Sequence, residues 1–385
     1  MKICVISNLY EPYERGGAER VARLMANELA AVGHDVVVIT TRPEVGLAVE
    51  QKDKVKIYRF RPLNLFCYPD LVKHGAITRI VWHILDTFNC HSALCVKKIL
   101  RQERPDLVVT HNLKGIGYLL PLVIHRLKTK HIHVLHDVQL AVPSGLIIKG
   151  KEDDHLVGGL AARIYARVCR ALFRSPDVVV SPSNWLMKFY EARGFFAGSL
   201  KKTMPNPVPV SEQPVVVKSQ KQNRYLFVGQ IEKHKGVEWL IDFWRTNKMT
   251  GELLVVGDGS FCPVNVPLNV KLLGKQSGDM LNTFFAQSDF FIVPSLCYEN
   301  SPTVIPLAYA NATSVIVANI GGAGELVEQN KTGFLFDVGD ADSLRGALEK
   351  ANSLTAEEYQ KMSGNCLAQA QKFSVREYVD KLILP

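Results

Sequence analysis

Residues 2–40 read KICVISNLYEPYERGGAERVARLMANELAAVGHDVVVIT, and this stretch decides the fold. It begins and ends with short apolar runs, which are typical of buried β-strands. Between them, apolar residues recur at helical spacing over residues 18–32, on the face made by Val21, Leu24, Met25 and Leu29. Gly33 follows as a helix stop. The stretch therefore predicts a strand, a helix and a second strand, the repeating unit of a parallel sheet.

The same alternation continues along the chain, with one interruption. Further apolar runs predict strands of the first half within residues 55–60, 106–112, 131–137 and 177–183. Residues 204–222 contain four prolines and predict a linker. After it, apolar runs within residues 224–229, 252–259, 270–274, 290–295 and 314–319 alternate with predicted helices at 237–244, 279–287 and 303–310. Most runs are apolar along their whole length, as strands buried on both faces of a parallel sheet are.

A chain of 385 residues exceeds the size at which a single core usually stops growing, so two domains are expected. We predict an α/β architecture with two doubly wound, Rossmann-like parallel-sheet domains, residues 1–205 and 206–372, and a helical tail over residues 373–385. Open parallel sheets bind ligands at the carboxyl ends of their strands. The cleft between the two domains is therefore the expected site.

The composition is that of a soluble globular protein, with 47% hydrophobic and 22% charged residues. Its longest apolar stretches fall short of the roughly 20 residues that a membrane span needs. The N-terminus resembles a buried strand rather than a signal peptide, so we expect a cytoplasmic protein. The eight cysteines include no Cys-x-x-Cys pair, and we expect reduced thiols.

Positive charge is concentrated in the first half of the chain. Residues 1–205 carry 30 Lys and Arg against 18 Asp and Glu, whereas residues 206–385 carry 16 against 19. Four arginines would form one stripe on a helix, namely Arg163, Arg167, Arg170 and Arg174. This stripe fits two interpretations equally: a solvated helix face, or docking of the basic domain on a membrane surface. Nucleic acid is not an expected partner, because no basic motif of a known reader is present.

Two loops between a strand and a helix contain candidates for binding an anion. Gly16 and Gly17 start the first helix, where glycines let the backbone approach an anion and direct free N–H groups at it. A simple tight turn is the alternative, and no G-x-G-x-x-G dinucleotide fingerprint follows any strand. In the second domain, Lys235 lies between a strand and a helix and could reach a phosphate, although an exposed loop lysine is the common alternative.

Polar residues also follow the apolar run 290–295, beginning with Glu299, Asn300 and Ser301. A carboxylate there can accept bonds from two sugar hydroxyls while backbone amides behind it hold an anion. Helix capping by Ser301 or Thr303 is the alternative interpretation, but capping does not require an acid.

Histidines lie in or after two predicted strands of the first domain. We expect His131 and His133 on one face of a strand and His136 at its end. No cysteine or carboxylate ligands accompany them, so we expect no metal site. His111 and Asn112 also reach the carboxyl edge and are candidates for lining the acceptor side of the site, where a second substrate would bind, with loop capping as an equal alternative.

Together these motifs resemble one family over nearly the whole chain. The stretches that carry the resemblance are GGAER, the HD of VLHD, SPSNW, PNPV, FVGQIEKHKGVEWL, LLVVGDGS, FFIVPSLCYENSP and VIVANIGGAGELV. In order and spacing, the sequence is similar to the retaining nucleotide-sugar glycosyltransferases of the GT-B fold, family 4. The resemblance implies that the tail helix crosses back to the first domain and that no metal or other cofactor is required.

The resemblance also implies roles for individual residues. Gly16 and Gly17 would lie close to the donor diphosphate and the acceptor, and His136 near the donor sugar. Lys235 would neutralise the donor diphosphate. Glu299 matches the first glutamate of an E-x7-E motif, which binds donor-sugar hydroxyls. The remaining donor-binding residues would be Gln230, Asn300, Ser301 and Thr303.

The donor region departs from the family pattern at three points. Leu307 stands where the second glutamate of the motif is expected to hold the nucleotide ribose, and loss of one such bond costs about 1.5–3 kcal/mol. Residues 312–314 replace the usual Gly-Thr-Pro, and Gln230 stands where arginine is common. Either the ribose is held differently or the chain is a non-catalytic subunit. We favour activity, because Gly17, His136, Lys235 and Glu299 are retained.

The predicted reaction is transfer of a sugar from a UDP- or GDP-type nucleoside diphosphate sugar to a hydroxyl of a glycan or lipid-linked glycan, with retention of configuration. A diphosphate oxygen would help deprotonate the acceptor, and His136, Lys235 and Glu299 are the predicted catalytic residues. The expected setting is bacterial cell-surface polysaccharide or lipopolysaccharide synthesis, in the cytoplasm or at the inner face of the plasma membrane. The alternatives are a non-catalytic GT-B subunit that binds a glycan or partner enzyme and, more weakly, a hydrolase or epimerase.

Overall fold

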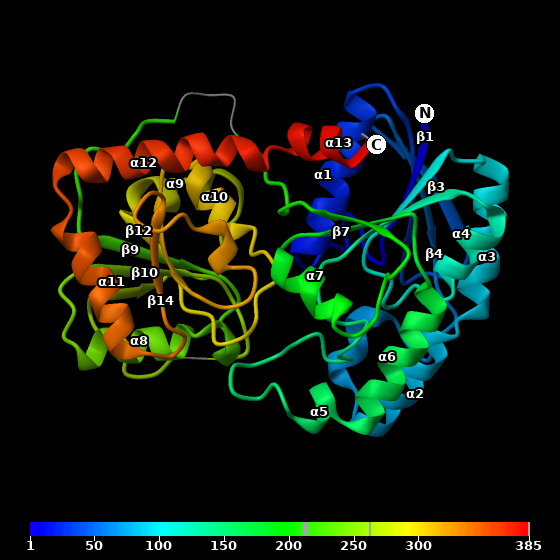
Figure 1. Ribbon diagram of the computed structural model, residues 1–385, viewed down its shortest axis with the longest axis horizontal. Coiled ribbons are helices and arrows are strands. Elements are labelled where there is room, and N and C mark those ends of the chain that lie inside the picture. Colours follow the sequence, from blue (N-terminus) through cyan, green and yellow to red (C-terminus); the bar gives the residue numbers. More distant parts are fainter. Residues whose placement is uncertain (211–214, 262, 384–385) are drawn as a thin grey trace. The chain divides into compact units, whose positions relative to one another are not determined.

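The computed structural model describes residues 1–210, 215–261 and 263–383, and the chain divides into two compact units (Figure 1). The first unit comprises Met1–Gly145, Asp154–Pro205 and the residues from Tyr378 onward. The second comprises Leu146–Asp153 and Asn206–Glu377. Cys262 and residues 211–214 of the predicted linker lie outside the described residues.

The first unit contains an eight-stranded sheet in the order β3-β4-β2-β1-β5-β6-β7-β8. Its strands are β1 Lys2–Ile6, β2 Asp35–Thr41, β3 Leu47–Lys52, β4 Val55–Phe60, β5 Leu107–Thr110, β6 Lys130–Val134, β7 Val178–Ser181 and β8 Leu200–Thr203. Its helices are α1 Gly17–Ala31, α2 Ala76–Thr87, α3 Cys90–Glu103, α4 Leu120–Leu127, α5 His155–Gly158, α6 Leu160–Phe173 and α7 Asn184–Glu191. Every strand pair is parallel except β3 with β4.

The second unit contains a six-stranded, entirely parallel sheet in the order β11-β10-β9-β12-β13-β14. Its strands are β9 Arg224–Val228, β10 Glu252–Val256, β11 Val270–Leu272, β12 Phe290–Val293, β13 Ser314–Ala318 and β14 Gly333–Phe336. Its helices are α8 Val237–Thr246, α9 Gly278–Gln287, α10 Val304–Ala310, α11 Ala341–Ser353 and α12 Ala356–Ala370. The last helix, α13 Val375–Ile383, begins in this unit and ends in the first.

The second sheet has a hydrophobic core on each face, as a doubly wound fold requires. Figure 1 shows α9, α10 and α12 above the sheet and α8 and α11 below it. Alternate strand residues divide between the two cores: Phe290 and Ile292 belong to one, and Phe291 and Val293 to the other. This alternation explains why the strands are apolar at every position.

Three strands escaped the sequence prediction, namely β3, β8 and β14, and all three lie at sheet edges. β3 is an exposed, largely polar edge strand that pairs with β4 antiparallel, so it lacks the continuous apolar run of an interior strand. β8 forms the opposite edge and is also largely exposed. The first sheet is therefore parallel over seven strands and carries one antiparallel edge.

The predicted boundary at residue 205 was wrong for one internal segment. Leu146–Asp153 belongs to the second unit because its backbone pairs there: Ile148 forms a bridge with Cys297, and the Lys149 amide donates to the Leu296 carbonyl at 2.9 Å. The chain from Tyr378 onward belongs to the first unit, where Tyr378, Val379 and Leu382 join the core.

The seven cysteines among the described residues form no disulfide. None of the helices in the described ranges is both long enough and apolar enough to cross a membrane.

Candidate functional site

The second unit brings Lys235 and Glu299 together at the carboxyl edge of its sheet. Lys235 follows β9 and Glu299 follows β12, and these strands are neighbours in the sheet although the two residues are 64 positions apart. The Lys235 Nζ donates to Glu299 Oε1 at 2.8 Å, and the Ser295 hydroxyl donates to the same oxygen at 2.7 Å. Both charged side chains are partly shielded, with 26% of Lys235 and 13% of Glu299 exposed.

The two loops are held against each other by their backbones. Gly236, directly after Lys235, has φ +74°, and a Cβ at this position would lie 1.9 Å from the Pro294 carbonyl oxygen. Only glycine therefore allows this approach. The Leu296 amide also donates to the His234 carbonyl at 2.9 Å. This contact fixes the distance between the lysine loop and the glutamate loop.

A third loop fixes the backbone of Glu299. Glu299 forms a parallel bridge with Gly321, and the Gly322 amide donates to the Glu299 carbonyl at 2.6 Å. Gly321 has φ +60°, and a Cβ there would lie 2.3 Å from the same carbonyl oxygen. The GG of the IGGAGE stretch thus supports the glutamate from behind.

The charge on Lys235 is stabilised by its partner. Burial acts to lower the pKa of Lys235, but the nearby Glu299 carboxylate outweighs burial and raises the pKa above its ordinary value. The lysine is therefore a cation across the physiological pH range. A fixed, partly buried ammonium at a strand end suits a phosphate ligand.

Two polar atoms next to Glu299 are buried without a partner. Among the described residues, neither Asn300 Oδ1 nor Ser301 Oγ has a hydrogen-bond partner. The turn itself is well supported, because Asn206 Nδ2 donates to the Ser301 carbonyl at 3.0 Å. Thr303 flanks α10 but its side chain makes no capping bond. The helix-capping interpretation of Ser301 and Thr303 was therefore wrong, and the unsatisfied atoms fit a site for a polar ligand.

The segment Leu146–Asp153 packs against the glutamate loop, a contact that sequence reasoning missed. Its Ile147 carbonyl accepts from the Tyr298 amide at 2.9 Å, and its Glu152 Oε1 accepts from the Tyr298 hydroxyl at 2.8 Å. Backbone pairing carries most of this contact, so no side-chain pattern in the sequence signals it.

Two predicted donor residues lie at the margin of this arrangement. Gln230 is exposed in the loop after β9. Leu307 is partly buried and packs on the core beneath α10, and its carbonyl accepts from Asn311 Nδ2 at 2.9 Å. Leu307 thus completes a hydrophobic contact and offers no polar side-chain atom to a ribose.

The glycine loop of the first unit differs from its prediction. The Gly16 amide is not free, because it donates to Glu19 Oε2 at 2.9 Å. Glu19 is buried, so the N-terminus of α1 already holds a carboxylate of its own chain. Gly16 and Gly17 are both exposed. The loop supplies one fewer N–H group to an external anion than the sequence predicted.

His111 and His136 pair at the carboxyl edge of the first sheet. His111 Nδ1 and His136 Nε2 share a hydrogen bond of 2.8 Å, and the rings stack. Burial lowers the pKa of His136 to about 4, and burial together with His136 lowers the pKa of His111. Both rings are neutral at pH 7. They line a cavity of about 20 Å³, room for one water, together with Asn112.

His131 and His133 share one hydrogen-bond partner, Thr110. Both rings hydrogen bond to the Thr110 hydroxyl, each at 2.8 Å, which places them on one face of β6 as predicted. His111 Nε2 is buried without a partner among the described residues. Within those residues, no three His, Cys, Asp or Glu side chains are grouped as metal ligands.

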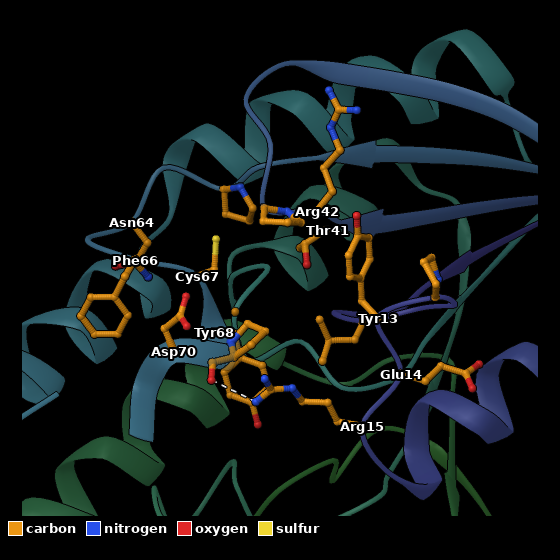
Figure 2. A pocket seen from close by; sticks show the side chains of 16 residues that line it. Tyr13, Glu14, Arg15, Thr41, Arg42, Asn64, Phe66, Cys67, Tyr68 and Asp70 are labelled. Carbon is orange, nitrogen blue, oxygen red and sulfur yellow. Dashed lines mark hydrogen bonds between the residues drawn. The ribbon is translucent and has the colours of Figure 1, made fainter. Parts of the chain in front are cut away.

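The first unit also contains a pocket of about 350 Å³ that the sequence analysis did not identify (Figure 2). Figure 2 places Asn64 and Phe66 across the pocket from Tyr13. Arg15 Nη1 donates to the Pro69 carbonyl at 2.9 Å and narrows one side. The pocket is lined by Leu9, Pro12, Tyr13, Glu14, Arg15, Thr41, Arg42, Pro43, Pro62, Asn64, Phe66, Cys67, Tyr68, Pro69, Asp70 and Gly115.

The lining of this pocket combines aromatic rings with charges of both signs, because Glu14 and Asp70 lie in it beside the arginines. Aromatic rings provide flat apolar surfaces for a sugar ring, while Arg15 and Arg42 provide cations. Arg42 Nε is buried with no hydrogen-bond partner among the described residues. The signal was present in the sequence, because two of the loops that line the pocket, residues 9–15 and 62–70, mix proline, aromatic and charged residues after predicted strands.

Comparison with known families agrees with this architecture. Residues 16–201 match the glycosyl transferase 4-like domain, and residues 222–352 match the glycosyl transferases group 1. The chain belongs to the group 1 glycosyltransferases. Its two Rossmann-like units are those of the GT-B fold, so the predicted fold class and family are confirmed.

Individual relatives extend over different shares of the chain. An uncharacterized 42.6 kDa protein in the cps region of Klebsiella pneumoniae is 27% identical over 89% of this chain and 92% of its own. The UDP-Gal:alpha-D-GlcNAc-diphosphoundecaprenol alpha-1,3-galactosyltransferase of Escherichia coli is 32% identical over 34% of this chain and 35% of its own. Among solved structures, Anabaena HepE in complex with UDP-glucose has a TM-score of 0.67 and 17% identity, over 100% of this chain and 99% of that one.

Proposed function

We propose that this glycosyltransferase moves a hexose from a UDP- or GDP-type nucleotide sugar to a hydroxyl of a glycan or lipid-linked glycan, with retention of configuration. The Lys235–Glu299 pair carries this proposal, because a fixed cation and a carboxylate lie beside the unpartnered atoms of Asn300 and Ser301. Two comparisons support a nucleotide-sugar donor: the E. coli relative is named as a galactosyltransferase that uses UDP-Gal, and HepE has UDP-glucose bound. The Klebsiella relative supports a role in surface polysaccharide synthesis.

In this reaction Lys235 offsets the charge that grows on the departing diphosphate. Its raised pKa keeps it protonated at neutral pH, which such electrostatic stabilisation requires. Glu299 keeps one oxygen on Lys235 and Ser295 and orients the donor sugar through its hydroxyls. The neutral His136 acts near the sugar as a hydrogen-bonding group rather than as a charge.

The pocket of the first unit is our candidate for the acceptor sugar. Tyr13, Phe66 and Tyr68 would stack on the sugar, and Arg15 and Arg42 would hold a phosphate of a lipid-linked acceptor. Burial raises the pKa of Tyr68 to about 12, so its hydroxyl stays a hydrogen-bond donor. His111 and Asn112, predicted for the acceptor side, do not line this pocket.

One observation favours a second candidate function. Because Leu307 offers no acceptor to a nucleotide ribose, a non-catalytic subunit that binds a glycan or partner enzyme remains the alternative. Donor binding separates the two proposals.

The decisive experiment is calorimetric titration of the protein with UDP, GDP and ADP. We expect micromolar binding of one nucleotide, weakened at least about tenfold by Lys235→Ala, since one charge-assisted bond to phosphate is lost. Lys233→Ala is the matched control, because Lys233 lies in the same short helical turn but is 75% exposed and pairs with Glu238 instead. No binding up to millimolar concentration would favour the non-catalytic subunit.

A further inference from the structure

Helix α2 of the first unit carries an apolar face that the unit leaves in water. Six large apolar side chains there are between 42% and 81% exposed, namely Ile77, Ile80, Val81, Ile84, Leu85 and Phe88 at its C-terminal end. Most follow the i, i+3, i+4, i+7 spacing of one helical stripe. A surface helix normally shows polar residues outward, so the orientation of α2 is inverted.

The opposite face of α2 is firmly attached, so the apolar stripe is not a core surface awaiting closure. Trp82 is buried and its Nε1 donates to the Phe66 carbonyl at 2.8 Å. Asp86 is buried as well, and its Oδ2 accepts from the Gly115 amide at 2.8 Å. These two anchors are one helical turn apart and fix which face points outward.

Cations lie on a neighbouring helix. Between His155 and Arg174 the chain has four arginines and no acidic residue, and all four arginines are exposed. Arg174 follows the end of α6 rather than lying within it, which shortens the predicted stripe by one residue. Leu160 and Ile164 are exposed on the same helix, at 74% and 51%.

Helices α2 and α6 lie close to one another within the unit. The loop that follows β5 contacts both: the Gly115 amide donates to Asp86 of α2 at 2.8 Å, and the Tyr118 ring packs on Phe173 of α6 with the ring centroids 5.6 Å apart. Figure 1 draws both helices at the same end of the first unit. Apolar and cationic side chains are therefore exposed at one end of it.

We propose that this end of the first unit, α2 with α6, docks on the surface of an anionic membrane, with the α2 stripe in the interfacial layer and the α6 arginines on lipid phosphates. Charge complementarity selects the lipid surface, because a helix with an exposed apolar stripe beside clustered arginines is the composition of interfacial helices. A second copy of the chain is a less suitable partner, because in a symmetric dimer through this surface the four arginines of one copy would face the four arginines of the other.

Docking at α2 would also place the pocket of the first unit at the membrane. Phe66 lines that pocket and its ring stacks on Trp82 of α2 at 6.1 Å, while Asn64 Nδ2 donates to the Trp82 carbonyl at 3.4 Å. An acceptor carried on a lipid diphosphate would then reach the pocket without leaving the bilayer. This step rests on the proposed function, whereas membrane docking itself does not.

The test is co-sedimentation of the whole protein with vesicles of equal parts phosphatidylcholine and phosphatidylglycerol, without donor or acceptor. Ile77→Gln with Ile84→Gln should weaken binding at least about tenfold, and Arg163→Gln with Arg167→Gln should abolish the preference over pure phosphatidylcholine vesicles. Val264→Gln with Leu268→Gln is the control, because these apolar side chains are also strongly exposed, at 73% and 103%, but belong to the second unit. Thermal melts would show that each variant is folded.

Two outcomes would overturn the proposal. One is wild-type protein that stays in the supernatant, or an α2 variant that binds the vesicles as tightly as the wild type does. The other is a wild-type dimer in sedimentation velocity that the α2 substitutions convert to monomer while vesicle binding is absent, which would make the stripe an interface between copies. Because no nucleotide is present, failure here and failure of the proposed function are distinguishable.

Discussion

The glycine loop after β1 and the lysine loop after β9 look alike in the sequence but differ in what they leave available. Both lead from a parallel strand into a helix through glycine. In the first, Gly16 is extended, with φ −146°, and its amide is used by Glu19 of the same helix. In the second, Gly236 is left-handed and fits against the backbone of another loop.

This difference teaches that a glycine at a strand end has two separate uses. Gly236 is required because its backbone is left-handed and lies against the Pro294 carbonyl, and this loop contact brings Lys235 to Glu299. Gly16 is compatible with a side chain, because a Cβ would approach only the flexible end of Glu19, at 3.2 Å. In the first loop the Gly16 amide is used by its own helix, while in the second the Lys235 ammonium pairs with Glu299 and stays partly exposed.

The largest expected effect is that of Gly236→Ala. The substitution combines a left-handed backbone with a Cβ 1.9 Å from the Pro294 oxygen, so the two loops must separate. We expect a loss of about 3–5 kcal/mol of unfolding free energy and a Tm lower by about 10 °C for the second unit. Differential scanning calorimetry measures the shift, and nucleotide binding should be lost as well.

Gly16→Ala is the matched control for this comparison. It should change the unfolding free energy by less than about 0.5 kcal/mol, because φ near −146° is open to any residue. Equal destabilisation by both substitutions would contradict the distinction between the two loops.

The next effect concerns the charge that the second loop presents. In Glu299→Gln the carboxylate that raises the pKa of Lys235 is gone, and burial alone lowers it. The proposed binding of a nucleoside diphosphate uses the protonated lysine, so affinity should fall as pH rises through that pKa. The wild type should keep its affinity to about pH 9, whereas the variant should lose about tenfold between pH 8 and 10.

Calorimetric titrations across this pH range measure both profiles. Lys235→Ala should show weak binding with no alkaline loss, because it has no ammonium to deprotonate. If the wild type and Glu299→Gln lost affinity over the same pH range, Glu299 would not control the charge state of Lys235.

The same comparison shows how far the sequence could predict the structure. The strands of both sheets were predictable because burial on two faces makes them apolar at most positions, as in β12. The edge strand β3 was not, because one side of it meets water and its residues are largely polar. Leu146–Asp153 was assigned to the wrong unit because backbone bonds, which leave no residue pattern, hold it beside Cys297.

The candidate site was predicted residue by residue but not as an arrangement. The sequence indicated Lys235 and Glu299 as ligands for different parts of a donor, and it could not show that they bind each other, since that depends on β9 and β12 being neighbours. The Glu19 contact was equally hidden. A glutamate three residues after a helix start is a sequence signal for a helix cap. Only the structure shows that this glutamate is buried and that it occupies the Gly16 amide, which is then not available to an external anion.

The smallest expected effect tests that cap directly. Burial raises the pKa of Glu19, so between its unfolded and folded pKa values the native state binds more protons than the unfolded state. This carboxyl therefore lowers the stability of the first unit as pH rises through that window. Glu19→Gln keeps an oxygen for the Gly16 amide and removes the charge, so its stability relative to the wild type should increase as pH rises above the ordinary glutamate pKa of about 4.3.

Glu19→Ala separates the hydrogen bond from the charge. It frees the Gly16 amide and should cost about 1 kcal/mol, a Tm lower by about 2–4 °C, with little dependence on pH. If the glycine loop can hold an external anion, inorganic phosphate should recover part of this loss in Glu19→Ala and none in the wild type. Recovery in both proteins would mean that the loop binds anions despite Glu19, and the two loops would then be alike in use as well as in sequence.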